Sequence, residues 1–460
     1  MLTRSLICAA LMTLGWFVMI TANGNALQLS ETRGGKLIQD YITALNSGDE
    51  ATMRAYLETN VAPAALKNRP VAPRLAIMLD LHQRWQSATI NEVASATDTT
   101  TTALITTKAG DWFAFTMLHD RSEPAKMLGI QIEDVEPLST VKLQPLTSKQ
   151  LLTEVAAALD SHSKADDFSG VALVAHNGKP VFFKAYGFAD TGLKVSNKLD
   201  TKFNLGSINK KFTEIGIEML IAQGKLSYSD TLGKLLPDYP NREAASKVTV
   251  RHLLQMQGGI GDFFGEAFDA TPKDKLRHNN DFIPLFANEK LHFEPGTNSE
   301  YSNGGYILLG AIIEKASGMD YYDFIRANIF EPAGMSNTDW FETDSRTPNL
   351  AEGYTLEGAA DGKRISNVHT RPARGSAAGG GYSTAEDLLK FVNAAADGKF
   401  GAASEHARGL GIAGGAPGIN AALESDLKGG YTVIVLSNYD PPSAERIARE
   451  LRQLISRVTN

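Results

Sequence analysis

Residues Phe203 to Thr213 read FNLGSINKKFT, and this stretch decides how the rest of the chain is interpreted. A Leu-Gly pair ends an extended approach and apolar residues then recur at helical spacing, so the sequence predicts a helix that begins at Ser207. Positions three apart share a helix face, so the Lys210 ammonium can reach the Ser207 hydroxyl. A desolvated lysine near a helix N-terminus loses basicity, and it can then accept the serine proton at neutral pH.

The spacing alone does not identify a nucleophile, because a helix-capping serine followed by a solvated lysine has the same spelling. Ser-x-x-Lys also begins at Ser139, Ser161 and Ser425. Two of these serines follow no strand-to-helix step, and Ser425 lies beside a Gly-Gly turn. The assignment of Ser207 therefore depends on the rest of the chain.

A second triplet, Tyr301-Ser302-Asn303, stands on a predicted loop just before the apolar run from Ile307 to Ile313. A phenol beside an ammonium is expected to have a lowered pKa, toward that of a general base. The Asn303 amide can hold either a substrate carbonyl or the lysine. The same spelling at Tyr239 lies in a proline-containing loop and carries no such expectation.

These two triplets, in this order, resemble the serine β-lactamase and penicillin-binding-protein family, in the branch of class C β-lactamases, D-alanyl-D-alanine carboxypeptidases and related esterases. Further segments match the family's pattern at Val250–Leu254, Gly318–Met335 and Gly379–Leu388. The resemblance covers most of residues 150 to 458. It implies an α/β (α+β) fold in which an antiparallel sheet flanked by helices meets a helical subdomain, with the cleft between them.

The resemblance also implies two-step acyl transfer without a cofactor. Ser207 is the expected nucleophile, Lys210 and Tyr301 are the expected proton carriers, and Asn303 is expected to position the substrate. Water then releases the acyl group. A neutral ester or amide of a small molecule or a peptide is the expected substrate, and peptidoglycan is a further candidate.

The third element of the family is a Lys or His followed by one residue and Gly, and this chain departs from it. Its counterpart is Ile412-Ala413-Gly414-Gly415, with Ile412 in the place of the basic residue. The backbone of Gly414 and Gly415 is still expected to contact the substrate, with the Gly415 N–H as an oxyanion donor. Isoleucine cannot bind a carboxylate, which argues against penicillins and D-Ala-D-Ala ends.

Two other features of this region leave the function open. The stretch from Phe391 to Gly411 is shorter than family members normally have, as if a strand or hairpin were missing. His406 is a candidate replacement for the missing cation, against the alternative of a solvated loop histidine. A secreted pseudoenzyme that binds peptidoglycan or a protein is therefore one alternative function. A binding role of the N-terminal region is another.

Residues 150–460 form the predicted hydrolase domain. Strands are predicted at Ser169–Ala175 and Pro180–Gly187, joined by an Asn-Gly hairpin turn. Two more are predicted at Ile419–Glu424 and Tyr431–Ser437, followed by an amphipathic helix over Ala444–Val458. Both ends of the domain are thus expected to build one sheet.

Residues 28–140 predict a small α+β domain, with helices first and a meander of strands afterwards. Its opening resembles cone-shaped nuclear-transport-factor-like domains. His82, Trp85 and Trp112 could line a pocket there, with ordinary core packing as the alternative. Residues 141–149 are the expected linker. The helices are expected at Leu37–Leu45, Met53–Leu57 and Leu75–Trp85, and the strands at Ile90–Ala94, Thr102–Thr107, Trp112–Met117 and Met127–Ile132.

Residues 1–26 read as a secretory signal, because Arg4 precedes an apolar stretch and small residues end at Ala26. A membrane anchor is the alternative, but it needs about 20 apolar residues. A secreted or periplasmic protein without stable membrane insertion is expected. The single cysteine, Cys8, falls in the signal, which excludes disulfides and cysteine catalysis from the mature chain.

Composition agrees with this reading of the chain. At 460 residues and 43% hydrophobic content the chain is too long for one ordinary core, so two domains are expected. The formal charge of -7 and the lack of a basic cluster give no sign of a nucleic-acid partner. No Cys/His cluster has zinc spacing, and no metal is expected.

Overall fold

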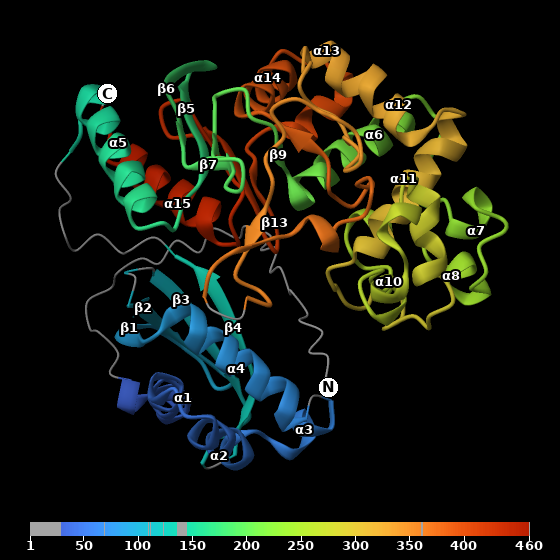
Figure 1. Cartoon of the computed structure of the whole chain (residues 1–460). Coiled ribbons are helices and arrows are strands. Elements are labelled where there is room, and N and C mark those ends of the chain that lie inside the picture. Colours follow the sequence, from blue (N-terminus) through green and yellow to red (C-terminus); the bar gives the residue numbers. More distant parts are fainter. Residues whose placement is uncertain are drawn as a thin grey trace. The chain divides into compact units, whose positions relative to one another are not determined.

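A computed structural model describes residues 29–459, except for residues 69, 109, 111, 123, 136–144 and 360–361 (Figure 1). The described residues divide into two compact units, a smaller one within residues 29–135 and a larger one within residues 145–459. The predicted signal, Cys8 and part of the predicted linker lie outside the described residues. Within the described ranges, no helix is long and apolar enough to cross a membrane.

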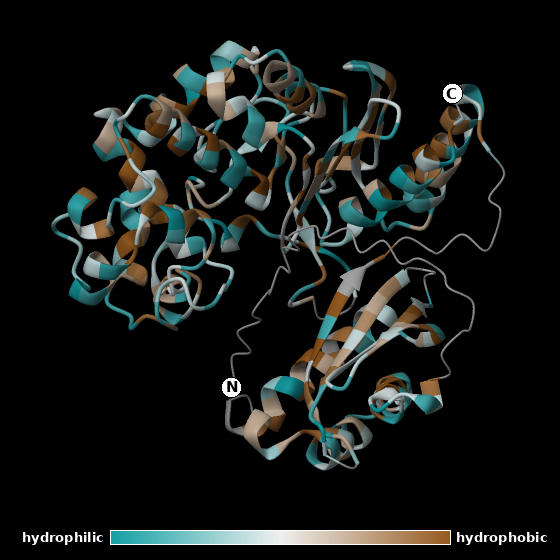
Figure 2. Ribbon diagram, turned by 180° about the vertical axis from the view of Figure 1, so that it is seen from behind, coloured by the Kyte–Doolittle hydropathy of each residue, from teal (hydrophilic) through white to brown (hydrophobic). Residues whose placement is uncertain are grey.

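The smaller unit is an α+β structure, as predicted. Helices precede a four-stranded antiparallel sheet in the order β1-β2-β3-β4. Its core packs the apolar faces of the helices on one face of this sheet, and Figure 2 shows these hydrophobic stripes. The elements are η1 (Leu29–Glu31), α1 (Gly35–Ser47), α2 (Glu50–Asn60), α3 (Pro63–Asn68), α4 (Val71–Trp85), β1 (Ala88–Ala96), β2 (Thr100–Thr107), β3 (Trp112–His119) and β4 (Met127–Asp134).

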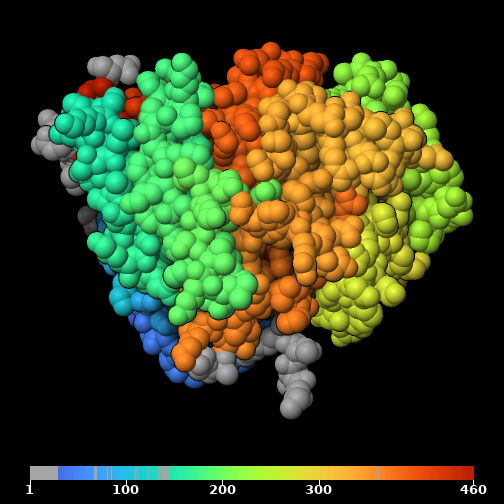
Figure 3. Space-filling view, turned by 45° about the horizontal axis from the view of Figure 1, so that its top comes forward, coloured from blue at the N-terminus to red at the C-terminus, as the bar shows by residue number. Residues whose placement is uncertain are grey.

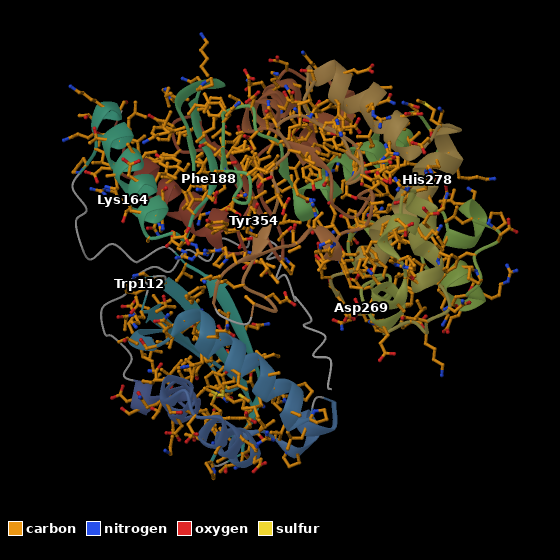
Figure 4. The ribbon with its side chains drawn as sticks, in the orientation of Figure 1. Trp112, Lys164, Phe188, Asp269, His278 and Tyr354 are labelled. Carbon is orange, nitrogen blue, oxygen red and sulfur yellow. The ribbon has the colours of Figure 1, made fainter. Side chains whose placement is uncertain are left out.

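Two of the three candidate pocket residues of this unit, His82 and Trp85, have packing roles. His82 Nδ1 lies 2.8 Å from the Leu45 carbonyl oxygen at the end of α1. Trp85 is buried and stacks on Phe113 with ring centroids 5.0 Å apart. Trp112 begins β3, where Figure 4 labels it. The structure thus favours ordinary packing for His82 and Trp85.

The larger unit is built on a five-stranded antiparallel sheet in the order β13-β14-β15-β5-β6. Asn177 and Gly178 both take positive φ, 51° and 74°, which gives the tight hairpin turn predicted between β5 and β6. The last strand pairs with the first, so the sheet joins both ends of the unit as predicted. The strands are β5 (Gly170–His176), β6 (Lys179–Tyr186), β13 (Gly411–Ala416), β14 (Ile419–Leu427) and β15 (Tyr431–Ser437).

Helices cover both faces of this sheet, because its central strands are apolar on both sides. On one face, α5 (Ser148–Lys164) and α15 (Ser443–Ser456) lie together (Figure 1) and bury residues such as Val155 and Leu451. Thr147 begins α5 with a capping box. The opposite face belongs to the large core shared with the helical part. The predicted fold class is confirmed.

Short strands pair outside the main sheet of the larger unit. Strand β9 (Phe203–Asn204) pairs with β12 (Tyr382–Ser383) and runs directly into a 3-10 turn and a long helix. The backbone N–H of Thr191 donates to the Tyr354 hydroxyl at 2.8 Å, and Figure 4 shows Tyr354 near Phe188. The short strands are β7 (Phe188–Asp190), β8 (Val195–Ser196), β10 (Tyr354–Thr355), β11 (Ile365–Ser366) and β12 (Tyr382–Ser383).

The helical part lies between β9 and β13 in the sequence. The elements are η2 (Gly206–Ile208), α6 (Asn209–Ala222), α7 (Leu232–Leu235), α8 (Arg242–Lys247), α9 (Val250–Leu254), α10 (Glu266–Ala270), η3 (Lys273–Lys275), η4 (Asn279–Leu285), α11 (Asn303–Ser317), α12 (Tyr321–Ile325), the π-helix η5 (Arg326–Phe330), α13 (Glu331–Ala333), η6 (Val368–Thr370), α14 (Ala385–Ala396) and η7 (Gly401–Ala407).

Candidate active site

Ser207 lies in the 3-10 turn η2, directly before α6, as the sequence predicts for a strand-to-helix step. The turn depends on Gly206, whose φ of 51° is rare for residues with a side chain. Its N–H donates to the Asn204 side chain at 2.9 Å. A Cβ at position 206 would lie 2.9 Å from the Gly415 nitrogen, so the turn packs tightly on strand β13.

Lys210 is one helical turn from Ser207, and only 2% of its surface is exposed. Its Nζ lies 3.2 Å from the Ser207 Oγ, 2.6 Å from the Asn303 Oδ1 and 2.5 Å from the Ala378 carbonyl oxygen. Burial lowers the pKa of Lys210 to about 7, while the charges of Asp262 and Glu214 act in the opposite direction. The Lys210 side chain is therefore neutral in a large fraction of the molecules at physiological pH.

Tyr301 completes a cluster with these two residues, because its Oη lies 2.5 Å from the Ser207 Oγ. Its ring centroid is 4.8 Å from the Lys210 Nζ. The expected lowering of its pKa is wrong. Burial raises the pKa of Tyr301 to about 12, the Asp262 charge adds to this, and the hydrogen bond with Ser207 only partly offsets it. The phenol therefore keeps its proton at neutral pH.

Asn303 is the first residue of α11, and both ends of its amide are engaged. Its Oδ1 accepts from Lys210, and its Nδ2 donates to the Asp262 Oδ2 at 2.7 Å. Ser302 caps the helix by accepting from the Gly305 N–H at 2.8 Å, and it donates to the Gly261 carbonyl at 3.0 Å. The loop that contains Asp262 is thereby fixed against the start of α11.

Strand β13 brings Gly414 and Gly415 to the nucleophile, as the sequence predicts. A Cβ on Gly414 would lie 2.1 Å from the Leu205 carbonyl oxygen and 2.6 Å from the Ser207 nitrogen. Only glycine permits so close an approach of two backbones. Because β13 is an edge strand, one of its backbone edges is not used by the sheet. Backbone N–H groups therefore converge near Ser207.

Ile412 and His406 do not supply a cation to this cluster. Ile412 is partly buried and packs against the large core of the unit. His406 lies on η7, with its Nε2 3.6 Å from a Glu218 carboxylate oxygen. Glu218 is eleven residues after Ser207, roughly 16 Å along the helix. His406 therefore does not replace the missing basic residue. The connection from α14 to β13 contains η7 and no strand.

Sequence reasoning missed several partners in the site. These are the Ala378 carbonyl, the Asp262 carboxylate, the Glu214 carboxylate and Tyr306, which accompany Lys210 or its neighbours. A carbonyl group has no sequence signature. Ala378 lies just before the Gly379–Leu388 segment, so the glycine run there was the one available signal.

The site lies apart from two hollows of the described surface. One, of about 360 Å³, is lined by residues of α6, η5 and η7, including Met219 and Lys399. The other, of about 310 Å³, includes Lys273 and Arg371. On the face drawn in Figure 3 the surface is hollowed between orange segments, which follow α13 in the chain. Among the residues that the structure describes, no cluster of histidine and carboxylate side chains could hold a metal ion.

Comparisons with known proteins agree with this architecture. The model of the family described as Beta-lactamase matches residues 155–456, so the chain belongs to the β-lactamase family. This family consists of serine hydrolases that act through an acyl-enzyme. The predicted resemblance of the larger unit is confirmed. Nothing in these comparisons identifies the family of the smaller unit.

Two bacterial relatives are similar in sequence. Penicillin-binding protein 4* of Bacillus subtilis is 38% identical over 195 residues, which are 41% of this chain and 42% of that protein. The Bacillus subtilis protein PbpX is 30% identical over 297 residues, 60% of this chain and 72% of that protein. The matched region thus spans less than half of the length of the first relative.

Two solved structures share the fold. The penicillin-binding protein of Bacillus halodurans aligns with a TM-score of 0.59 and 28% identity, covering 64% of this chain and 99% of that one. The D-amino acid amidase of Ochrobactrum anthropi SV3, complexed with L-phenylalanine amide, aligns with a TM-score of 0.56 and 25% identity. That alignment covers 67% of this chain and 98% of the amidase.

Proposed function

We propose that this protein is a secreted serine hydrolase that cleaves an ester or amide through an acyl-enzyme on Ser207. One observation carries the proposal: the Ser207 hydroxyl lies within hydrogen-bond distance of both a buried lysine and a tyrosine. Such a pair of neighbours is the arrangement that activates a serine nucleophile.

Lys210 is the base in this mechanism. A neutral amine has two N–H bonds and one lone pair. If Asn303 Oδ1 and the Ala378 carbonyl accept the two N–H bonds, the lone pair points to the Ser207 hydroxyl. The Ser207 oxygen then attacks the substrate carbonyl as its proton moves to Lys210.

Tyr301 carries the proton onward as a neutral phenol. Its hydroxyl contacts Ser207 and therefore lies where the leaving group departs. The phenol donates its proton to the leaving nitrogen or oxygen and takes the proton held by Lys210. In the second half of the reaction, a water molecule occupies the leaving group's place and attacks the acyl carbon. Its proton passes in the reverse direction, through Tyr301 and Lys210, to the Ser207 oxygen as the bond between that oxygen and the acyl group breaks.

The oxyanion is stabilised by the backbone N–H groups of Ser207 and Gly415, which the contact of η2 with β13 brings close together. Asn303 positions the substrate with its second Nδ2 hydrogen, since the first is donated to Asp262. In other hydrolases with an oxyanion hole, one such donor contributes about 3 to 4 kcal/mol.

Two further observations support the proposed substrate class and the proposed location. The isoleucine at position 412 disfavours substrates that are recognised by a free carboxylate, so neutral esters or amides are proposed. Peptidoglycan is a further candidate, because relatives are named penicillin-binding proteins. The leader-like residues 1–26 support export across the membrane.

A pseudoenzyme that binds peptidoglycan or a protein partner is the second candidate function. It is favoured by the absence of a basic side chain at Ile412 and by the short connection through η7. This candidate predicts that Ser207 forms no covalent adduct with reactive acyl or phosphonyl probes.

Mass spectrometry of the intact protein separates the two functions. We expect a fluorophosphonate to add one label to the wild-type chain, because a base beside Ser207 activates it. Ser207→Ala should abolish the label. Ser161→Ala is the matched control, because Ser161 has the same Ser-x-x-Lys spelling on the exposed side of α5. A wild-type protein that resists both a fluorophosphonate and a fluorescent penicillin would identify a pseudoenzyme.

A further inference from the structure

A buried turn of backbone supplies one of the acceptors of the Lys210 amine. Residues 376–379 form this turn, and two backbone hydrogen bonds of 2.7 and 3.1 Å between its end residues close it. Ala377 and Ala378, at its centre, expose only 0% and 3% of their surface. Connecting segments usually run over the surface, because buried backbone groups need hydrogen-bond partners. The partners of this turn therefore indicate what holds it in the site.

Side chains from three separate parts of the helical region bind the carbonyl groups of this turn and of the residue before it. Each carbonyl accepts a hydrogen bond from a different buried side chain. The pairs are Tyr322 Oη to Gly375 at 2.7 Å, Trp340 Nε1 to Ser376 at 3.0 Å, Thr213 Oγ1 to Ala377 at 2.7 Å and Lys210 Nζ to Ala378 at 2.5 Å. In addition, the Ala377 N–H donates to the Asn279 Oδ1 at 3.1 Å. The turn is thus held from several sides.

Thr213 and Lys210 bind neighbouring carbonyls from one face of α6, because they stand three residues apart. Within a helix, a threonine hydroxyl commonly donates to a carbonyl one turn back, but Thr213 donates to the Ala377 carbonyl. A hydroxyl has a single hydrogen, so the Thr213 oxygen accepts from the Tyr321 Oη, 2.8 Å away. Tyr321 is fully buried at the start of α12, which lies beside α6 (Figure 1). A one-way chain of hydrogen bonds therefore runs from Tyr321 through Thr213 to Ala377.

We propose that Thr213 is a positioning residue for the base Lys210. Its hydrogen bond fixes the turn, and the fixed turn keeps the Ala378 carbonyl in contact with the lysine amine. This inference rests on the proposed function of Ser207. A neutral amine turns about its last carbon–nitrogen bond unless acceptors hold its hydrogens. Loss of the Ala378 acceptor therefore lets the lone pair turn away from the Ser207 hydroxyl, and a small misplacement of a reacting group slows a reaction strongly.

The same carbonyl affects the protonation of Lys210. It accepts a hydrogen bond from the charged ammonium as well as from the amine, and such an acceptor favours the charged form. A turn that has moved away should therefore lower the pKa of Lys210. A substitution at Thr213 does not alter the other ionisable groups around the lysine. These are Tyr301 and Tyr306, whose ring centroids lie 4.8 and 5.4 Å from its Nζ, and Asp262 and Glu214, whose charges raise its pKa.

The rate at which a fluorophosphonate labels Ser207 reports the attack of the serine and can be measured over a range of pH. Thr213→Val removes the hydroxyl and keeps the shape of the side chain. We expect this variant to be labelled at least about tenfold more slowly than the wild-type chain at about pH 9, where the lysine is neutral in both. The midpoint of its pH profile should move to lower pH, so the loss should be smaller at about pH 6 than at about pH 9. Thr213→Ser, which keeps the hydroxyl, should restore both the rate and the midpoint.

Thr338→Val is the matched control. It also removes a buried threonine hydroxyl of the larger unit, one that bonds to Ser383 and Asp387 and not to the turn. We expect a lower melting temperature with the labelling rate and midpoint of the wild-type chain. The double variant Thr213→Val/Tyr321→Phe guards against misfolding, because it also removes the phenol hydroxyl that loses its acceptor in Thr213→Val. It should have native circular dichroism and be labelled as slowly as Thr213→Val.

These variants separate the role of Thr213 from the proposed function. A wild-type chain that is not labelled would overturn both. Equal labelling of the wild-type chain and Thr213→Val would overturn only the role of Thr213. A Thr213→Val protein that is slower by one factor at every pH, or that Thr213→Ser does not rescue, would overturn it too, because Thr213 would then only stabilise the fold. A slow Thr213→Val with a lowered midpoint and rescue by serine supports both.

Discussion

At the scale of single residues, burial controls the chemistry of the site. A lysine ammonium is costly to remove from water, and the acceptors around Lys210 stabilise it without supplying a full negative charge in direct contact. The side chain therefore titrates near neutrality. The same burial acts in the other direction on the Tyr301 phenol, which stays protonated.

The pH dependence of activity follows from these two pKa values. Because only neutral Lys210 accepts a proton, kcat/KM for an ester without ionisable groups should rise with pH around a midpoint near 7, falling tenfold per unit below it. No loss from Tyr301 is expected below pH 10, because its pKa is about 12. His406→Ala is the control, since it removes a histidine that lies outside the cluster. A midpoint that moves in this variant would contradict the assignment to Lys210.

The residues of the cluster could be read from the sequence because their chemistry needs particular side chains at particular spacings. Ser207 and Lys210 share a helix face, and Tyr301 and Asn303 precede another helix. Asp262 could not be predicted from the sequence, because it contacts Asn303 only when its loop folds back onto the start of α11. The direction of the Tyr301 pKa shift could not be predicted from the sequence either. Burial of the phenol raises this pKa, and the neighbouring Lys210 side chain is largely uncharged and does not offset the effect.

At the scale of elements, the contact between the η2 turn and the β13 strand determines the oxyanion site. Two glycines in different segments, Gly206 and Gly414, permit this contact. The sequence predicted that Gly414 and Gly415 lie near Ser207 because of the family's third motif. It did not predict that the backbones would approach so closely, since spacing gives no measure of interatomic distance.

Gly414→Ala tests the importance of this contact. The added methyl group would lie 2.1 Å from the Leu205 carbonyl oxygen, so β13 must move away from Ser207. We expect the rate of fluorophosphonate labelling to fall about a hundredfold, as for the loss of an oxyanion donor, with a lower melting temperature. Gly411→Ala is the control on the same strand, because its Cβ would meet no atom within 4 Å. Equal effects of the two substitutions would contradict the prediction.

The β-hairpins were the best-predicted elements, because Asn177-Gly178 specifies a tight turn and the flanking strands are continuous apolar runs. The short helices α7 to α10 carry too few residues to show a period, so the sequence outlined the helical part only coarsely. The absence of a strand before β13 could be inferred because the stretch from Phe391 to Gly411 is short. The sequence did not predict that the 3-10 helix η7 takes the place of that strand.

At the scale of the whole molecule, the site belongs entirely to the larger unit. All residues of the cluster lie between Ser207 and Gly415, and their supporting elements begin at α5. The division of the chain near residue 143 agrees with a shift in composition toward proline, threonine and serine in the sequence. The described residues of the smaller unit show no polar cluster that indicates a ligand.

A chain that begins at residue 145 should therefore keep an active Ser207. This start retains Leu146, which pairs with Val458, and the Thr147 cap of α5. We expect the shortened protein to be labelled by a fluorophosphonate at a rate within about threefold of the full chain, as measured by intact mass. A folded but unreactive fragment, with native circular dichroism, would instead show that residues before 145 contribute to the site.

The pairing of β15 with β5 has a consequence for the order of events on the ribosome. Strand β5 is made early, yet its second neighbour arrives only with residues 431–437, near the end of the chain. Until then, one edge of β5 has no partner, and its Val171–Ala175 stretch is buried in the finished sheet. A nascent chain that stops before residue 431 therefore carries an open, apolar edge, which makes incomplete products prone to aggregation and visible to chaperones and proteases.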